Sequence, residues 1–202
     1  MKKIFKTMFV LMCGFVMASS FVACGSDDDN SNSNEQQSGG GEETTVVDKN
    51  VAKVTVAYKY VTTEDLLKIF DMKMEFVDPL TGKAQAEMIT STSWSKSYQP
   101  KLPFVTGMRL TTTLKEGVTL ESIRNTPEYT VLDPILEYEV IAYNVKGQIL
   151  FEGNSGGGGE PVKATGEKVA LGYEKNVFNK SFYNTYTANS DWGIFEEKGK
   201  WQ

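Results

Sequence analysis

The chain carries few side chains that are able to catalyse a reaction. It contains no histidine and only two cysteines, Cys13 and Cys24. Without histidine, serine–histidine and cysteine–histidine nucleophilic catalysis are excluded, as are the histidine ligand sets of zinc and copper sites. Carboxylates, Lys, Tyr, Ser and Thr remain. We therefore expect a non-catalytic protein with no catalytic residue, no metal site and no cofactor.

The acidic pair Glu137 and Glu139 is the one arrangement that fits a known mechanism. A glycosidase uses two carboxyl groups roughly 5–10 Å apart, and residues two apart on one strand face are separated by about 7 Å. The two glutamates alternate with Leu136, Tyr138 and Val140. This alternation favours the plainer interpretation, in which both glutamates lie on the solvent face of a sheet, and leaves a carboxylate-dependent glycosidase as a remote alternative.

Aromatic and amide side chains are concentrated near the end of the sequence. Aromatic rings stack on sugar C–H surfaces, and short amides pair with sugar hydroxyls, so this composition fits a glycan site. The candidate ligand-binding residues are Trp94, Tyr186, Trp192 and Trp201. The alternative is a final pair of strands whose aromatic side chains fill the core, with asparagines in the connecting turns.

The first residues have the pattern of a secretory signal. Three lysines (Lys2, Lys3 and Lys6) precede an apolar run over residues 8–18. Eleven residues make a helix of about 16 Å, whereas the hydrocarbon core of a bilayer is about 30 Å thick. The run is too short to span a membrane, and we expect residues 1–23 to be a cleaved signal peptide.

Cys24 follows this segment in a recognisable context. The residues Phe21-Val22-Ala23-Cys24 resemble a bacterial lipobox, although the family pattern has Leu or another aliphatic residue where this chain has Phe21. The resemblance implies that Cys24 is acylated and becomes the new N-terminus, a lipid anchor that holds the protein on a membrane. The alternative is an ordinary signal peptide cut near Ala23. Cys13 leaves with the signal, so no disulfide is possible in the mature chain.

The residues behind Cys24 are acidic. Ser26, Asp27, Asp28 and Asp29 resemble the export signal that surface lipoproteins of the Bacteroidetes carry behind the lipidated cysteine, a likeness of about ten residues with the lipobox included. The resemblance implies an outer-membrane lipoprotein displayed on the cell surface. The alternative is a solvated acidic tether without a sorting role.

Charge is unevenly distributed along the chain. Removing residues 1–23 takes away three lysines and no acid, which leaves 18 basic and 26 acidic residues and a net charge of −8. Most of this excess lies in residues 24–49, a segment rich in Ser, Asn, Gln, Gly and acids that we expect to be a disordered tether. Residues 50–202 are nearly neutral, which excludes a nucleic-acid partner. They are long enough for a single domain.

Alternating apolar and polar residues predict a β-rich domain. Strands are expected over 53–60, 72–77, 84–90, 108–115, 136–142 and 148–152, with short helical turns over 62–70 and 119–123. We expect residues 93–103 to be irregular and residues 153–159 to form a loop, and the type of residues 168–173 stays open. Six or seven short strands without a long helical pattern favour an all-β, antiparallel sandwich, immunoglobulin-like or transthyretin-like.

The sequence thus predicts a lipid-anchored surface protein that acts by contact. Its domain is expected to be a non-catalytic binding or interaction module, and its extracellular partner stays open between a glycan and a protein. The sharper interpretation is an accessory glycan-binding lipoprotein. The alternative is a protein-binding or structural module, such as an inhibitor, an adhesin or a pilus-type component.

Overall fold

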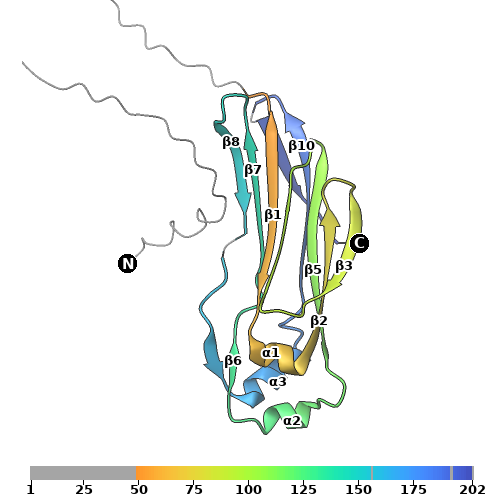
Figure 1. Cartoon of the computed structure of the whole chain (residues 1–202), viewed down its shortest axis with the longest axis vertical. Helices are drawn as coiled ribbons and strands as arrows, with labels where there is room; N and C mark the ends of the chain where they lie inside the picture. The colour runs from red at the N-terminus through yellow and green to blue at the C-terminus, as the bar shows by residue number, and fades with distance from the viewer. Residues whose placement is uncertain (1–48, 156, 192, 202) are drawn as a thin grey trace, which may run out of the picture. The chain divides into compact units, whose positions relative to one another are not determined.

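The computed structural model describes residues 49–155, 157–191 and 193–201. The predicted signal peptide, Cys24, the export signal Ser26–Asp29 and Trp192 lie outside these residues. The described chain forms eleven strands and three helices (Figure 1). Its two large sheets are antiparallel throughout, and the expected all-β sandwich is confirmed.

The first large sheet has four strands. They are β1 (Lys53–Val61), β4 (Ser93–Tyr98), β7 (Leu136–Tyr143) and β8 (Ile149–Asn154), in the order β4-β1-β7-β8. In β1 the side chains of Val54, Val56, Tyr58 and Tyr60 are buried, and the residues between them are not. This is the period of two that the sequence predicts for a strand with one face on the core.

The second large sheet has five strands. They are β2 (Phe70–Asp78), β3 (Lys83–Met88), β5 (Phe104–Leu114), β10 (Lys180–Asn189) and β11 (Gly193–Lys198), in the order β11-β10-β5-β2-β3. The β2–β3 turn is closed by Asp78, whose Oδ1 accepts a 2.8 Å hydrogen bond from the Leu80 amide. Gly82 has a φ of +69° in this turn, a conformation that glycine adopts without steric cost.

The two sheets pack face to face through large side chains. The rings of Tyr58 and Phe76 meet edge to face at 6.5 Å, and the Tyr58 hydroxyl donates to the Val77 carbonyl at 3.0 Å. The Tyr60 hydroxyl donates a hydrogen bond to Sδ of Met72 at 3.5 Å. Burial raises the pKa of Tyr60 to about 12. Each such side chain contributes about 1.5–3 kcal/mol through burial, so these contacts hold the sandwich together.

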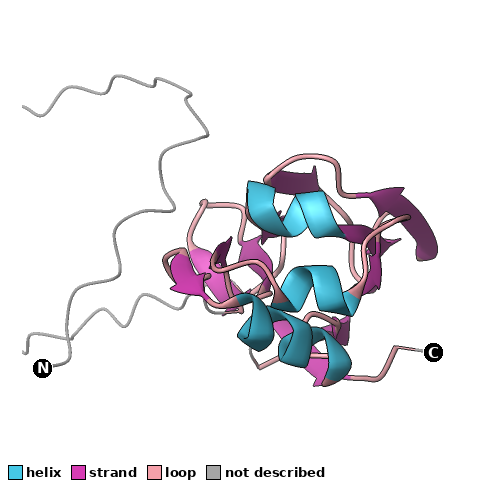
Figure 2. Cartoon of the chain, turned by 90° about the horizontal axis from the view of Figure 1, so that it is seen from below, coloured by secondary structure: helices cyan, strands magenta, loops and turns pink. Residues whose placement is uncertain are grey.

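All three helices lie at one end of the sandwich, together with a small third sheet (Figure 2). The helices are α1 (Glu64–Ile69), α2 (Leu120–Arg124) and α3 (Gly166–Glu174), and the small sheet pairs β6 (Tyr129–Val131) with β9 (Val162–Ala164). Each helix begins after a threonine whose hydroxyl accepts a hydrogen bond from an amide of the first turn: Thr63, Thr119 and Thr165.

Strand β6 is fixed to α1 by two side chains. Oδ2 of Asp65 accepts a 2.8 Å hydrogen bond from the Thr130 amide, and the Thr63 hydroxyl donates to the Thr130 carbonyl at 2.7 Å. The amide of Thr130 is the main reason that the pKa of Asp65 falls to about 2, with Lys68 adding to the effect. One edge of β6 is therefore occupied by α1 and the other by β9.

The structure differs from the sequence prediction in several segments. The expectation of an irregular stretch over 93–103 is wrong in its first half, because β4 occupies Ser93–Tyr98. Its serines are exposed while Trp94, Lys96 and Tyr98 are half-buried, so the alternation is present without a run of β-branched residues. The short strands β6 and β9 were not predicted, residues 168–173 are helical, and β10 and β11 are the expected final pair.

Candidate functional site

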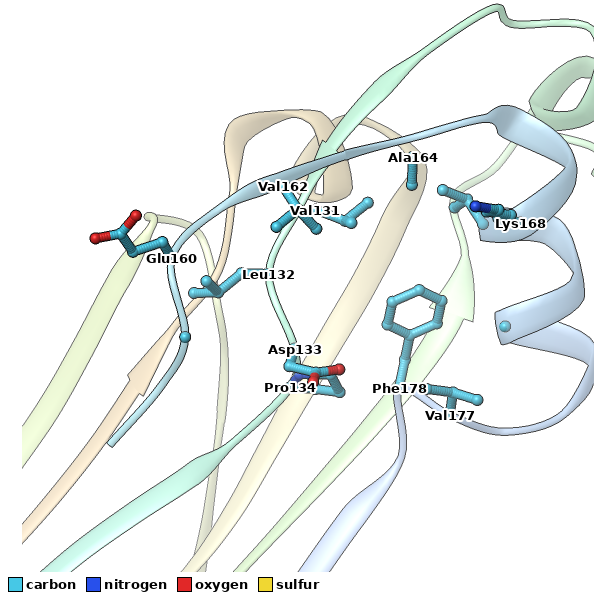
Figure 3. Close-up of a pocket in the computed structure, with 13 residues that line it drawn as sticks. Val131, Leu132, Asp133, Pro134, Glu160, Val162, Ala164, Lys168, Val177 and Phe178 are labelled. Carbon is cyan, nitrogen blue, oxygen red and sulfur yellow. The ribbon is translucent and has the colours of Figure 1, made fainter. Parts of the chain in front are cut away.

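An apolar pocket lies at the helical end of the domain. It has a volume of about 530 Å³. Phe178 and Val177 lie on one side of it, opposite Val131 and Val162 (Figure 3). Asp133, Glu160 and Lys168 are the charged residues in its wall. A volume of this size is typical of sites that hold a small molecule or a group of side chains.

Helix α3 forms one wall of this pocket and is held rigidly against α2. The amide of Gly166 donates to the Thr126 carbonyl at 3.2 Å. A Cβ at residue 166 would lie 1.9 Å from the Ile123 carbonyl oxygen, so only glycine fits here. Arg124 of α2 bridges the two helices through Glu167 at 3.3 Å and Glu174 at 2.5 Å.

Aromatic packing places Phe178 in the pocket. Its ring lies 5.1 Å from that of Phe70, which in turn stacks on Tyr173 of α3 at 5.3 Å. Phe178 is 8% exposed, whereas Val162 is 58% and Val177 is 39% exposed. The pocket therefore has a fixed floor and an exposed apolar rim.

A second pocket, of about 370 Å³, adjoins the first and shares Asp133 and Pro134 with it. The rings of Tyr138 and Phe182, which line it, stack on each other at 4.5 Å and join β7 to β10. Ser155 and Ser181 add hydroxyl groups to its lining. We call the two pockets together the groove.

The loop after β8 runs beside the groove. Ser155 is anchored to β7, since its hydroxyl accepts from the Tyr138 amide at 2.8 Å and donates to the Leu136 carbonyl at 2.9 Å. Further on, the Gly158 amide donates to Oε1 of Glu137 at 2.8 Å. The neighbouring Gly159 and Glu160 line the first pocket.

Glu137 and Glu139 differ in their surroundings. Glu137 is only 9% exposed, so the prediction that it lies on the open solvent face is wrong. It pairs with Lys59 at 3.2 Å, and the loop after β8 covers it through the Gly158 amide. Glu139 is half-buried, and desolvation, with a smaller effect of Glu152, raises its pKa. Neither glutamate lines either pocket of the groove.

Three of the predicted ligand-binding residues are described, and they are not brought together. Tyr186 is fully buried, with its ring stacked on Phe104 at 4.8 Å. Trp94 is half-buried, with its ring 5.2 Å from Phe76 and its Nε1 donating to Glu87 at 2.9 Å. The structure therefore gives Tyr186 and Trp94 a place in the packing of the sandwich.

Trp201 lies on the outer face of the five-stranded sheet. Its indole contacts Gly107 and meets the Tyr183 ring edge to face at 6.1 Å. The guanidinium of Arg109 lies 5.2 Å from the indole centre, within the range of a cation–π contact. Arg109 also pairs with Glu75 at 2.8 Å. This aromatic site is separate from the groove, which has none of these residues in its lining.

A partly buried polar cluster joins the two large sheets near the groove. Oε1 of Glu196 accepts hydrogen bonds from Asn184 and Tyr186 at 2.8 Å and from Tyr138 at 3.3 Å. Burial and these acidic surroundings raise the pKa of Tyr186 far above its usual value. The cluster is internally paired and fixes the orientation of Tyr138, which lines the second pocket.

Sequence reasoning missed most of the groove. Its residues come from four separate segments: 131–138, 155–164, 168–172 and 177–182. Phe178 and Phe182 belong to the aromatic segment noted in the sequence, but their spacing alone does not separate them from the core aromatics. The exposed valines of the rim carry no sequence signal.

Two further observations limit the chemistry of the described residues. They contain no group of three or more His, Cys, Asp or Glu side chains placed to bind a metal ion. None of the helices described is both long enough and apolar enough to cross a membrane.

Comparisons with known proteins give no relative to set beside this fold. The chain matches no protein-family model, no curated protein and no solved structure.

Proposed function

We propose that this chain is a lipid-anchored cell-surface protein whose sandwich domain binds a protein partner in the groove, without catalysis. The observation that carries the proposal is the apolar pocket of about 530 Å³ with an exposed valine rim. The lipobox-like residues before Cys24 and the acids at Asp27–Asp29 support the anchor and the surface location.

The lining of the first pocket favours a protein partner over a sugar. Most of its side chains are aliphatic: Val131, Leu132, Val162, Ala164, Val169 and Val177. A sugar needs hydrogen bonds at most of its hydroxyl groups, whereas aliphatic walls suit the apolar side chains of a protein. Val162 and Val177 are exposed enough to be covered by such a partner, and exposed apolar patches with a polar rim are typical of interfaces.

A photo-crosslinking experiment tests this proposal. We would place p-benzoylphenylalanine at Val162 in the full chain on intact cells, with Val145 as the control position. Val145 is 71% exposed in the turn between β7 and β8 and does not line the groove. We expect irradiation to give a discrete protein adduct from position 162 and none from position 145.

A matched substitution makes the result specific. With the crosslinker at Val177, Val162→Asp should abolish the adduct because a carboxylate at the rim is costly to bury, and Val145→Asp should leave it intact. Adducts of equal yield from positions 162 and 145, or no adduct from 162, would contradict the proposal.

A glycan is the second candidate, and one observation favours it. The stacked rings of Tyr138 and Phe182, with Ser155, Ser181 and Lys180 around them, give the second pocket an aromatic surface beside polar groups. A glycan array on the full chain tests this candidate. Binding that is lost in Phe182→Ala and kept in Trp201→Ala would support it, and a blank array would remove it.

A further inference from the structure

Strand β3 presents an open edge. It pairs with β2 on one side, and within the described part of the chain no strand pairs with its other side. Five of its six residues are exposed, and the sixth, Glu87, is half-buried. Figure 1 shows β3 as the outermost strand of its sheet. Such an edge offers unpaired N–H and C=O groups to a further strand.

The register shows which backbone groups face outward. Ile89 donates to the Met72 carbonyl at 2.8 Å, and the β2–β3 register continues as Lys73 opposite Met88 and Met74 opposite Glu87. Because hydrogen-bonded and non-bonded pairs alternate in an antiparallel ladder, the odd-numbered residues of β3 bond to β2. The N–H and C=O groups of Ala84, Ala86 and Met88 therefore point to the open edge.

The two faces of β3 carry different side chains: polar and charged residues on one face and small alanines on the other. Lys83, Gln85 and Glu87 share the face of β3 that continues the core side of the sheet, since Gln85 binds Asp78 at 3.1 Å and Glu87 binds Trp94. Ala84 and Ala86 lie on the opposite, outer face, where they offer little bulk.

We propose that β3 pairs with β3 of a second copy of this chain, antiparallel and with the two-fold axis at Gln85. In this register Lys83 lies opposite Glu87 of the second copy, and Glu87 lies opposite its Lys83. Ala84 and Ala86 exchange backbone hydrogen bonds with Ala86 and Ala84 of the second copy. A two-fold interface uses the same patch twice, so the patch must be self-complementary. The exposed edge of β3 is self-complementary in this register, because each lysine faces a glutamate and each alanine faces an alanine.

The charges also make the pairing selective. A charged side chain on an edge strand usually prevents association. Lys83 has no ion pair among the described contacts, while Glu87 binds Lys96 at 2.7 Å. A foreign strand leaves Lys83 unpaired, whereas a second copy supplies a carboxylate opposite it in the correct register. No residue of β3 lines the groove, so the pairing leaves the groove open.

Disulfide trapping tests the proposal on the full chain with Cys13→Ser and Cys24→Ser, so that an introduced cysteine is the only thiol. Opposed residues in a non-bonded antiparallel pair have Cα atoms about 4.5 Å apart, which fits the range of about 4.4–6.8 Å for a disulfide. We expect Gln85→Cys to form a covalent dimer quickly under mild oxidation. Ser95→Cys, on the exposed face of edge strand β4, is the matched control and should stay mostly monomeric.

Two added substitutions separate strand pairing from random collision. Ala86→Pro removes an outward N–H that no intrachain ladder bond uses, and Lys83→Glu places two carboxylates opposite each other. Each should slow disulfide formation by Gln85→Cys roughly tenfold, and Lys83→Arg should not. Circular dichroism checks that each variant is folded.

A measurement without a substitution in β3 completes the test. Carbodiimide treatment of a mixture of ¹⁴N- and ¹⁵N-labelled chains should give a mixed-isotope Lys83–Glu87 cross-link by mass spectrometry. Its absence, or equal trapping by Gln85→Cys and Ser95→Cys, would overturn the proposal.

Discussion

The indole of Trp201 lies over Gly107 at a distance that leaves no room for a side chain. A Cβ at residue 107 would stand 2.7 Å from Cζ3 of the indole and 3.0 Å from the Tyr183 ring. The absence of a side chain at Gly107 therefore allows Trp201, near the end of the described chain, to pack against the outer face of the five-stranded sheet.

Gly107→Ala should release Trp201 from this face. We expect a loss of about 1–2 kcal/mol in the free energy of unfolding, measured by urea denaturation, because the indole has to move away. Trp201→Ala should cost a similar amount, and the double variant should cost less than the sum of the two. Strictly additive losses would show that the two residues do not interact.

Gly166→Ala should separate α3 from α2. The added methyl would meet the carbonyl oxygens of Ile123 and Thr126, at 1.9 and 2.5 Å, and backbone atoms cannot give way as a side chain can. We expect a loss of roughly 2–3 kcal/mol. Gly157→Ala is the matched control, since nothing lies within 4 Å of a Cβ there, and it should change stability by less than about 0.5 kcal/mol.

The contact between Asp65 and Thr130 should make stability depend on pH in the acid range. The pKa of Asp65 is lowered from 3.8 to about 2 in the folded state, so its contribution is fully present above about pH 4–5 and is lost as the pH falls toward 2. Asp65→Asn removes the titration. The difference in unfolding free energy between the natural chain and Asp65→Asn should therefore shrink on acidification, and a difference that is constant from pH 6 to pH 2 would contradict this assignment.

Cys24→Ser should move the protein from the membrane to the soluble fraction. If Cys24 is acylated as proposed, three acyl chains at ~0.8 kcal/mol per buried CH₂ give stable attachment, and the serine variant cannot carry them. Cys13→Ser is the matched control, because that residue is predicted to leave with the signal. Unchanged fractionation of Cys24→Ser, measured by detergent partitioning, would refute lipidation.

Deleting Asp27–Asp29 should keep the protein in the membrane fraction but hide it from protease added to intact cells. Glu42→Gln with Glu43→Gln removes acids farther along the predicted tether and should leave protease sensitivity unchanged. Equal digestion of the deletion variant and the natural chain would leave these three acids without a sorting role.

Local pattern predicted much of the fold. The alternation in β1 and β7 specified both strands, and the helical turn expected over 62–70 contains α1. The strands β6 and β9 have three residues each, too few for a period of two to be recognised. Strand β6 is held by the hydrogen bonds of Thr63 and Asp65 to Thr130, and β9 pairs with β6, so both strands depend on tertiary contacts.

The site was harder to predict for the same reason. Leu132 and Phe178 face one pocket but are far apart in the sequence, and no spacing links them. Tyr186 and Phe182 are four residues apart in β10, yet Tyr186 is fully buried and Phe182 lines the groove. Composition identified the aromatic segment, and only the register of the strands separates its core residues from its exposed ones.

The described chain begins at Lys49, whose carbonyl oxygen lies 3.0 Å from the Cβ position of Gly193, and β1 then runs to the helical end where the groove is found (Figure 1). A pull between the first described residues and a ligand held in the groove would therefore act along the strands. The hydrogen bonds that join β1 to β4 and β7 would bear such a load together, in shear, and would not open one after another. With the proposed anchor at one end and the proposed partner at the other, the orientation of β1 would make the domain resist a pulling force in shear.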